Sequence, residues 1–163
     1  MRLLGLLLLF AATDCLAQDG WERYRLADPD SVIAAHEENC AEVLDGSSPV
    51  GVCAIMKDFP LTFEGAYGGQ VRPISAGPRQ LIEWWGQAQQ FPADYVDLYT
   101  REVLVGRGGV EGWVPIQEEL AELFDSLAIP KGAPLLLYVQ FVGGRAENDE
   151  TEWVFVTTRF DEL

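Results

Sequence analysis

The sequence predicts a single α+β domain, an antiparallel sheet packed with two or three helices, that follows a cleaved signal peptide. Three observations predict this organisation. Residues 1–17 have the pattern of a secretory leader, and residues 18–163 have the size of one domain. Helical periodicity alternates with strand-like runs along residues 18–163, without a linker or an internal repeat. Two cysteines, Cys40 and Cys53, remain after the leader is removed.

The N-terminal segment is typical of a cleavable signal peptide. Arg2 supplies a positive charge, residues 3–12 form an unbroken apolar run, and Ala17 offers a small residue before the cut. This run is far shorter than the ~20 residues that a spanning helix needs. We therefore expect an exported protein, periplasmic if the host is Gram-negative and otherwise secreted, with no integral membrane segment in the mature chain. Lipidation at Cys15 stays open, although Asp14 replaces the small residue that usually precedes a lipidated cysteine.

The chain is strongly acidic, with 26 Asp and Glu against 11 Lys and Arg and a formal net charge of −15. The leader contains one Arg and one Asp, so its removal leaves the net charge unchanged. Binding of DNA or RNA depends on Lys and Arg that neutralise phosphates. The composition therefore argues against nucleic acid as a partner, while basic partners and divalent cations are compatible with it.

Cys40 and Cys53 are predicted to form a disulfide, because an even cysteine count in an oxidising compartment usually reflects bridges. The bridge would close a loop over residues 40–53 and contribute about 3 kcal/mol. A pair of redox or metal-binding thiols is the alternative. That alternative is disfavoured because there is no Cys-x-x-Cys spacing and His36 is the only histidine.

The first half of the domain is expected to contain two helices and two strands. Apolar residues at intervals of three and four predict the first helix, with Asp30 or Ser31 as its cap. A proline begins the second helix and Phe91-Pro92 ends it. In chain order we predict an irregular lead-in over 18–29, a helix over 30–44, strands over 50–56 and 61–67, and a helix over 78–90.

The second half has mainly β character. Residues 106–109 are rich in glycine and predict a hairpin turn between two strands. Pro115 suits the first turn of a helix, and an amphipathic stripe follows it. In chain order we predict strands over 95–105 and 110–114, a helix over 116–127, and strands over 135–142 and 152–160.

From residue 61 onward the predicted order is strand, inserted helix, strand, strand, helix, strand, strand. Without the inserted helix, this is the order of an oligosaccharide/oligonucleotide-binding (OB) barrel, in which a helix lies between the third and fourth strands. Two arrangements are therefore open: an OB-like, partly open barrel, and a sheet backed by helices. The analogy concerns topology alone and implies no function.

No catalytic or cofactor motif is found. As a general base, His36 would need a nucleophile, and the sequence has no nucleophile motif such as Gly-x-Ser-x-Gly. His36 also lies one helical turn from Cys40. One histidine and two bridged cysteines do not supply a zinc site. The acidic segments 28–30 and 147–150 lack the spacing and central glycine of a calcium loop, although calcium binding there is left open. We predict no cofactor.

Aromatic and arginine side chains are the candidates for binding. Trp84 and Trp85 are adjacent on a predicted helix, about 100° apart, so burying both requires a broad covered face. Core packing is the favoured interpretation, and a ligand contact by one of them is the alternative, since tryptophan is enriched at binding hot spots. Arg101 and Trp113 lie in predicted strands, and Arg101 can pair with a carboxylate or hold an anionic ligand. The candidate binding residues are Trp84, Trp85, Trp113 and Arg101.

These features favour a non-catalytic, exported binding or interaction module whose partner is an unknown protein or small molecule and whose oligomeric state is left open. Two alternatives are kept. One is a carboxylate-based hydrolase of the cell envelope, because so many acidic residues always contain pairs. The other is an inhibitor of a secreted partner. Two carboxylates that converge in a deep pocket would favour the hydrolase, and an aromatic-lined face would favour the binding module.

Overall fold

The structure is a computed structural model that describes residues 20–44, 51–55, 59–147 and 150–163. The predicted signal peptide and Cys15 lie outside these ranges. The elements, in chain order, are a 3-10 turn η1 (Trp21–Arg23), β1 (Arg25–Leu26), α1 (Pro29–Leu44), β2 (Val52–Ala54), β3 (Pro60–Pro73), α2 (Ala76–Ala88), α3 (Ala93–Val96), β4 (Tyr99–Arg107), β5 (Val110–Gln117), α4 (Glu118–Ser126), β6 (Pro134–Glu147) and β7 (Glu150–Glu162).

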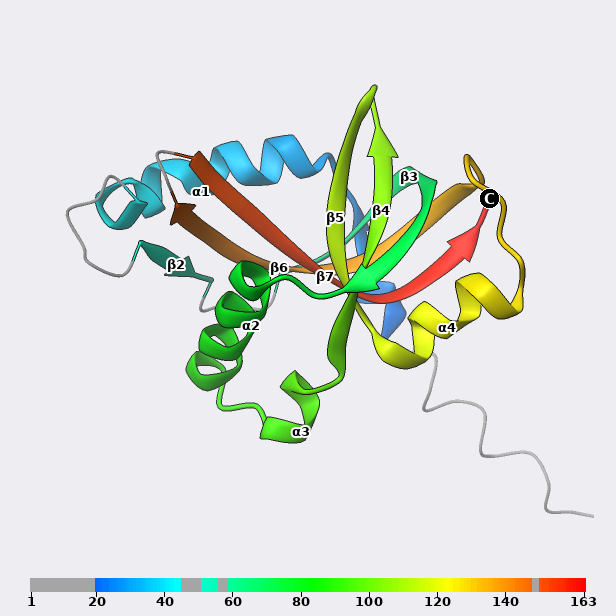
Figure 1. The fold of residues 1–163 in the computed structure, drawn as a ribbon. Coiled ribbons are helices and arrows are strands. Elements are labelled where there is room, and N and C mark those ends of the chain that lie inside the picture. Colours follow the sequence, from blue (N-terminus) through cyan, green and yellow to red (C-terminus); the bar gives the residue numbers. More distant parts are fainter. Residues whose placement is uncertain (1–19, 45–50, 56–58, 148–149) are drawn as a thin grey trace, which may run out of the picture.

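Seven strands form one sheet in the order β1-β3-β4-β5-β7-β6-β2, and β3 also pairs with β6. The five strands β3, β4, β5, β7 and β6 therefore make a closed ring of pairings (Figure 1). The ring is unevenly closed. β6 and β7 pair along most of their length, whereas β5 and β7 are paired at Ile116 and Thr157 alone in the described part of the chain.

The expectation of a single α+β domain is confirmed, but the sheet is mixed and not antiparallel as predicted. β5 and β7 run parallel because α4 leads from the end of β5 into β6, and the β6–β7 hairpin then reverses the chain again. β1 is also parallel to β3. The described residues form four α-helices instead of two or three, since the one-turn α3 occupies the start of the segment predicted as a strand over 95–105.

Two strands extend further than the sequence pattern indicates. β3 continues through Gly68 and Gly69, where a register shift in its pairing with β4 marks a bulge. Glycine is needed at position 68 because an added Cβ would lie 2.5 Å from Leu104 Cγ. β5 continues through Pro115, which pairs with Glu102 in β4 and does not begin a helix. The predicted strands stop too early because the prediction treats glycine and proline as strand ends. Bulges and strand edges tolerate both residues, so the strands continue through them.

The hydrophobic core has two parts. The larger cluster fills the interior of the ring and includes Phe63, Val105, Phe141 and Phe155. The second cluster lies between α2, α3 and the other face of β6 and β7. Tyr99, which is fully buried in this second cluster, has a phenol whose pKa is raised by burial, so the ring stays neutral. None of the described helices is long and apolar enough to cross a membrane.

Cys40 in α1 and Cys53 in β2 form a disulfide, as predicted, with their Cα atoms 5.6 Å apart. Because β2 pairs with β6, the bridge ties α1 to the sheet. His36 packs edge-on against Phe59 and Phe141, with ring centroids 5.3 and 5.1 Å away. Its Nδ1 lies 2.7 Å from the carbonyl oxygen of Val32. The half-buried histidine thus packs against aromatic side chains at the edge of the core, one helical turn before Cys40.

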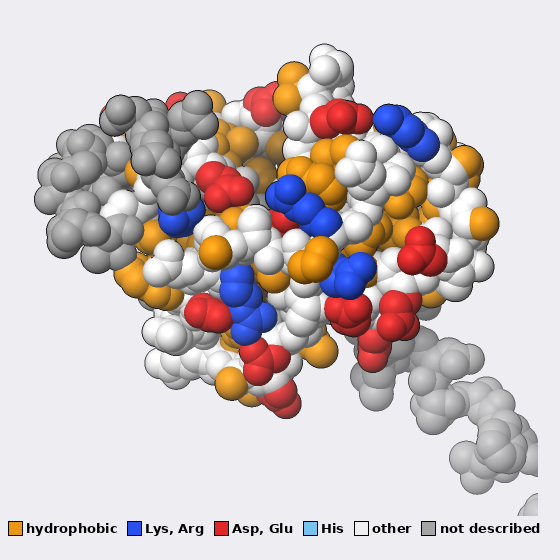
Figure 2. Space-filling view, in the orientation of Figure 1, with side chains coloured by type: hydrophobic (Ala, Val, Ile, Leu, Met, Phe, Trp, Pro, Cys, Tyr) orange, Lys and Arg blue, Asp and Glu red, His pale blue; other side chains and the backbone are white. Residues whose placement is uncertain are grey.

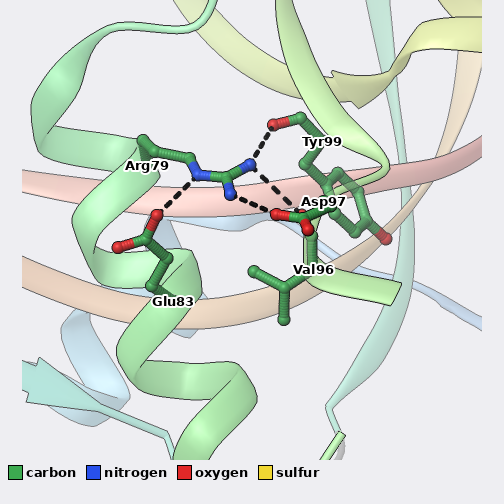
Figure 3. A network of polar contacts seen from close by, with 5 residues as sticks. All are labelled: Arg79, Glu83, Val96, Asp97 and Tyr99. Carbon is green, nitrogen blue, oxygen red and sulfur yellow. Dashed lines mark hydrogen bonds and ion pairs between the residues drawn. The ribbon is translucent and has the colours of Figure 1, made fainter. Parts of the chain in front are cut away.

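Arg79 in α2 stabilises the helical segment, formed by α2 and α3, that connects β3 to β4 (Figure 3). Its Nε donates to Glu83 Oε1 at 2.8 Å, and its Nη2 donates to Asp97 Oδ1 at 2.6 Å. Nη1 donates to the carbonyls of Val96 (3.5 Å) and Tyr99 (3.3 Å). The hydrogen bonds to Glu83 and then Asp97 raise the pKa of the guanidinium. One side chain therefore joins α2 to α3 and to the start of β4.

Reduction of the Cys40–Cys53 bridge is expected to lower the free energy of unfolding by about 3 kcal/mol, because the unfolded chain regains the freedom of the closed loop. Urea unfolding with and without reductant measures the change. The double variant Cys40→Ala/Cys53→Ala is the control and should not respond to reductant. Titratable thiols from both Cys40 and Cys53 in the denatured, non-reduced protein would show that the bridge does not form.

Substitution of Arg79 by Ala is expected to lower the free energy of unfolding by about 2 kcal/mol, because charge-assisted hydrogen bonds to two carboxylates are lost. Arg79→Lys keeps the charge but lacks the planar fork that reaches Glu83 and Asp97 together, so a loss of about 1 kcal/mol is expected. Urea unfolding of both variants tests this order. Equal stability of Arg79→Ala and the parent protein would contradict the role assigned to this side chain.

Candidate functional site

A cleft of about 560 Å³ opens between the β4–β5 hairpin, the start of α1 and β7. The hairpin stands away from β7 in Figure 1 and protrudes from the surface in Figure 2. The cleft exists because β5 and β7 diverge from their pairing at Ile116 and Thr157, which leaves the interior of the ring uncovered on that side. Its lining is mainly apolar and comprises Pro29, Asp30, Phe63, Val105, Arg107, Gly108, Val110, Gly112, Trp113, Val114, Trp153 and Phe155.

The strand register determines which side chains face this cleft. Paired residues of adjacent strands point to the same side of a sheet, and successive residues alternate. Val105 pairs with Gly112, and Val105 belongs to the interior cluster, so Gly112 and Val114 face inward. Trp113 lies between them and faces outward. Its ring packs under the guanidinium of Arg72, 3.9 Å from the ring centroid, so Trp113 offers the cleft its backbone and not its indole.

The rim of the cleft carries an ion-pair cluster. Arg107, at the end of β4, contacts Asp28 through Nη2, and its Nη1 lies 3.2 Å from Asp30 Oδ2. Asp28 also caps α1, because its Oδ2 accepts hydrogen bonds from the amide (3.3 Å) and the hydroxyl (2.8 Å) of Ser31. The hairpin is thereby fastened to the start of α1. Both carboxylates of the acidic segment 28–30, a candidate for calcium binding in the sequence, are paired with Arg107.

The candidate residues from the sequence are not brought together. Trp85 is 1% exposed in the second core cluster, and Trp84 is half-buried on the same helix. Arg101 lies near the other end of β4, where its Nη1 is 3.8 Å from Glu118 Oε1. Its Nε is buried without a hydrogen-bond partner in the described part of the structure. Of the four candidates, Trp113 alone borders the cleft.

The sequence reasoning missed most of the residues that form the cleft. Trp153 and Phe155 alternate along β7, and this spacing is the signal that could have found them, because it puts both rings on one face. Arg107 and Val110 flank the predicted turn and could have been placed at its base. Phe63 had no such signal, because its approach to Phe155 (ring centroids 6.3 Å apart) depends on the closure of the ring.

The outer face of β3, β4 and β5 carries a second polar cluster. Glu102 is fully buried, and its carboxylate accepts hydrogen bonds from Arg72 Nε and Ser75 Oγ, both at 2.8 Å. Arg72 is half-exposed and covers Trp113. Figure 2 shows basic side chains across this face over β4, β5 and α2, with acidic side chains interspersed among them. Because their charges are paired with each other, we interpret Arg72 and Glu102 as residues that stabilise this face of the sheet.

In the described ranges, no three His, Cys, Asp or Glu side chains come together as a metal site requires. The side chains of the acidic segment 147–150 lie outside the described part. No protein-family model matches the chain, and no curated protein matches its sequence.

Arg72→Met is expected to lower the free energy of unfolding by about 2 kcal/mol, because it leaves the buried Glu102 carboxylate without its cation. The double variant Arg72→Met/Glu102→Gln should recover most of that loss, since the amide carries no charge. Urea unfolding of the single and double variants measures both effects. A double variant no more stable than Arg72→Met would contradict this account.

Proposed function

We propose that this protein is an exported, non-catalytic binding module whose ligand site is the cleft between β5 and β7. The observation that carries the proposal is an apolar, aromatic-lined opening of about 560 Å³ into the core of the ring. Ligand sites are typically concave, mostly apolar and furnished with a few polar groups. Arg107 and Asp30 are those groups here, and Phe155 and Trp153 supply aromatic surface. The ligand of this site has an apolar part that replaces water against these rings.

The barrel belongs to the OB-like class in this proposal. The cyclic strand order β3-β4-β5-β7-β6, with α4 between β5 and β6 in the chain, supports it, because β5 and β6 are the third and fourth of these five strands in chain order. The parallel contact of β5 with β7 is the weakest closure of the ring, so the barrel is partly open. This topology supports a binding role by analogy alone, because a fold does not determine a function.

The cleft favours binding over carboxylate-based hydrolysis. Glycoside hydrolysis of that kind needs two carboxyl groups on opposite sides of the substrate, about 5 to 10 Å apart. The lining contains the carboxylate of Asp30, and that group is bonded to Arg107. The other lining residues have apolar side chains or are glycines, as at positions 108 and 112. An arginine-bound carboxylate beside apolar walls suits recognition better than proton transfer.

Export is the second part of the proposal. The disulfide between Cys40 and Cys53 fits an oxidising compartment, and the predicted leader over residues 1–17 would deliver the chain there. The compartment is the periplasm in a Gram-negative host and the extracellular medium otherwise.

Gly112 gives a way to fill the cleft without disturbing the strand. An added Cβ at this position meets no heavy atom within 4 Å, so Gly112→Leu should fold and place its side chain in the cleft. Gly106→Leu is the matched control on the outer face of the neighbouring strand. An added Cβ there makes ordinary contacts only, at 3.7 Å from Glu111 Cγ and 3.8 Å from the carbonyl oxygen of Ala66.

The purified protein is expected to enhance the fluorescence of N-phenyl-1-naphthylamine, a neutral apolar dye. Gly112→Leu should weaken dye binding at least tenfold, which corresponds to about 1.4 kcal/mol, and Gly106→Leu should bind like the parent. Fluorescence titration measures all three. Absence of dye binding by the parent, or an equal loss in both variants, would overturn the assignment of the cleft.

A further inference from the structure

We propose that the cleft takes an extended, basic peptide segment of a partner protein, which adds as a strand to the open edge of β5. This inference rests on the proposed function, because it assigns an occupant to the same cleft. It is carried by three properties of the site: the backbone groups along the edge, the apolar wall beneath it, and the charge of the rim. Addition of a peptide strand to a free sheet edge is a general mode of peptide recognition.

The register of the hairpin shows which backbone groups the edge presents. Gly108 and Gly109 form a two-residue turn with positive φ values of 59° and 87°, so the closing pair Arg107 and Val110 is hydrogen-bonded across the strands. Hydrogen-bonded and non-hydrogen-bonded pairs alternate along an antiparallel ladder. The next non-hydrogen-bonded positions in β5 are therefore 111, 113 and 115, whose C=O groups, together with the N–H groups of 111 and 113, point away from β4.

Of these outward positions, residue 113 borders the cleft, and residue 111 lies beside it toward the turn of the hairpin. β7 begins to pair with β5 only beyond them, at Ile116, within the part of the chain that the structure describes. Pro115 occupies one of the outward positions, where its missing N–H costs no bond to β4, and this agrees with the register. The parallel pairing of Ile116 with Thr157 uses the carbonyl of residue 115, so the amides and carbonyls of Glu111 and Trp113 are the groups available to an added strand. A peptide of five to seven residues spans them.

The side chains beside this edge suit an alternating peptide. Gly112 and Val114 face the apolar interior, and Gly112 leaves room because an added Cβ would have no neighbour within 4 Å. Side chains of an added strand alternate between the two faces of the sheet. Every second residue of the peptide would therefore enter the cleft toward Phe155 and Trp153, and the intervening residues would face solvent beside Glu111. This pattern calls for alternating apolar and polar residues.

The rim selects for positive charge. Arg107 is paired with two carboxylates, Asp28 and Asp30, so this cluster has a net negative charge. The Asp30 side chain is 80% exposed, and Glu111 is exposed on the edge itself. The whole chain carries a net charge of −15, which adds a long-range attraction for a cation. A Lys or Arg at either end of the peptide would complement this rim.

The test uses the peptide Lys-Val-Thr-Val-Thr-Val-Lys, with blocked ends, and isothermal titration calorimetry on the purified protein. Amides of the valines and of the threonines point to opposite edges of the extended peptide. N-methylation of one set is expected to abolish binding, while methylation of the other set leaves it within threefold. Replacement of both lysines by glutamates should weaken binding at least tenfold. Equal effects of the two methylations, or tighter binding of the acidic peptide, would overturn the proposal.

Two variants of one residue test the edge from the side of the protein. Glu111→Pro removes an outward N–H that makes no bond to β4, so the hairpin should fold, as far-ultraviolet circular dichroism can check. It should weaken peptide binding at least tenfold, whereas Glu111→Ala should weaken it no more than threefold through its lost charge. Equal affinities of these two variants would contradict strand addition.

The neutral dye separates the two proposals. If the dye binds and Gly112→Leu blocks it but the peptide does not bind, the peptide inference is wrong and the cleft holds a small apolar ligand. If neither the dye nor the peptide binds the parent protein, both proposals fail.

Discussion

Ile116 and Thr157 form the contact on which the barrel depends, because they join β5 to β7 and so close the ring. Both residues are fully buried. The Thr157 hydroxyl has no hydrogen-bond partner in the described structure, so the closure depends on the backbone pairing of the two strands and on the packing around it. Beyond it the strands separate and the cleft opens, and the interior side chains at its floor keep only a small exposed fraction, 6% for Phe63 and 9% for Phe155. The same contact therefore determines both where the core ends and where the cleft begins.

Sequence patterns correctly predicted the elements that are determined by residues close together in the chain. The first and last long helices, the Gly108–Gly109 turn and the Cys40–Cys53 bridge follow from periodicity, glycine content and cysteine count. α3 and the mixed character of the sheet were not predicted. The parallel contact of β5 with β7 joins residues 41 positions apart, and no local pattern encodes such a pairing. Pro115 was misplaced because its edge-strand role is visible only when the neighbouring strand is known.

The candidate site was harder to predict than the fold. Tryptophans were chosen by residue type, and type does not reveal burial: Trp85 supports the core, and the ring of Trp113 lies under Arg72. The cleft owes its shape to residues that are inconspicuous in the sequence, such as Gly112. A ligand site made by the divergence of two strands has no sequence motif, because its surface is assembled from segments that are distant along the chain.

α1 is attached at two points that lie on different sides of the ring. Near its start, Asp28 and Asp30 engage Arg107 of the hairpin. Further along, Cys40 is bonded to β2, which is joined to β6. The helix thus connects the β4–β5 hairpin, at its start, to the strand pair β2–β6, further along. Reduction of the bridge would remove the covalent one of these two attachments, so the redox state of the surroundings determines how firmly the helix that contributes Pro29 and Asp30 to the cleft is anchored to the sheet.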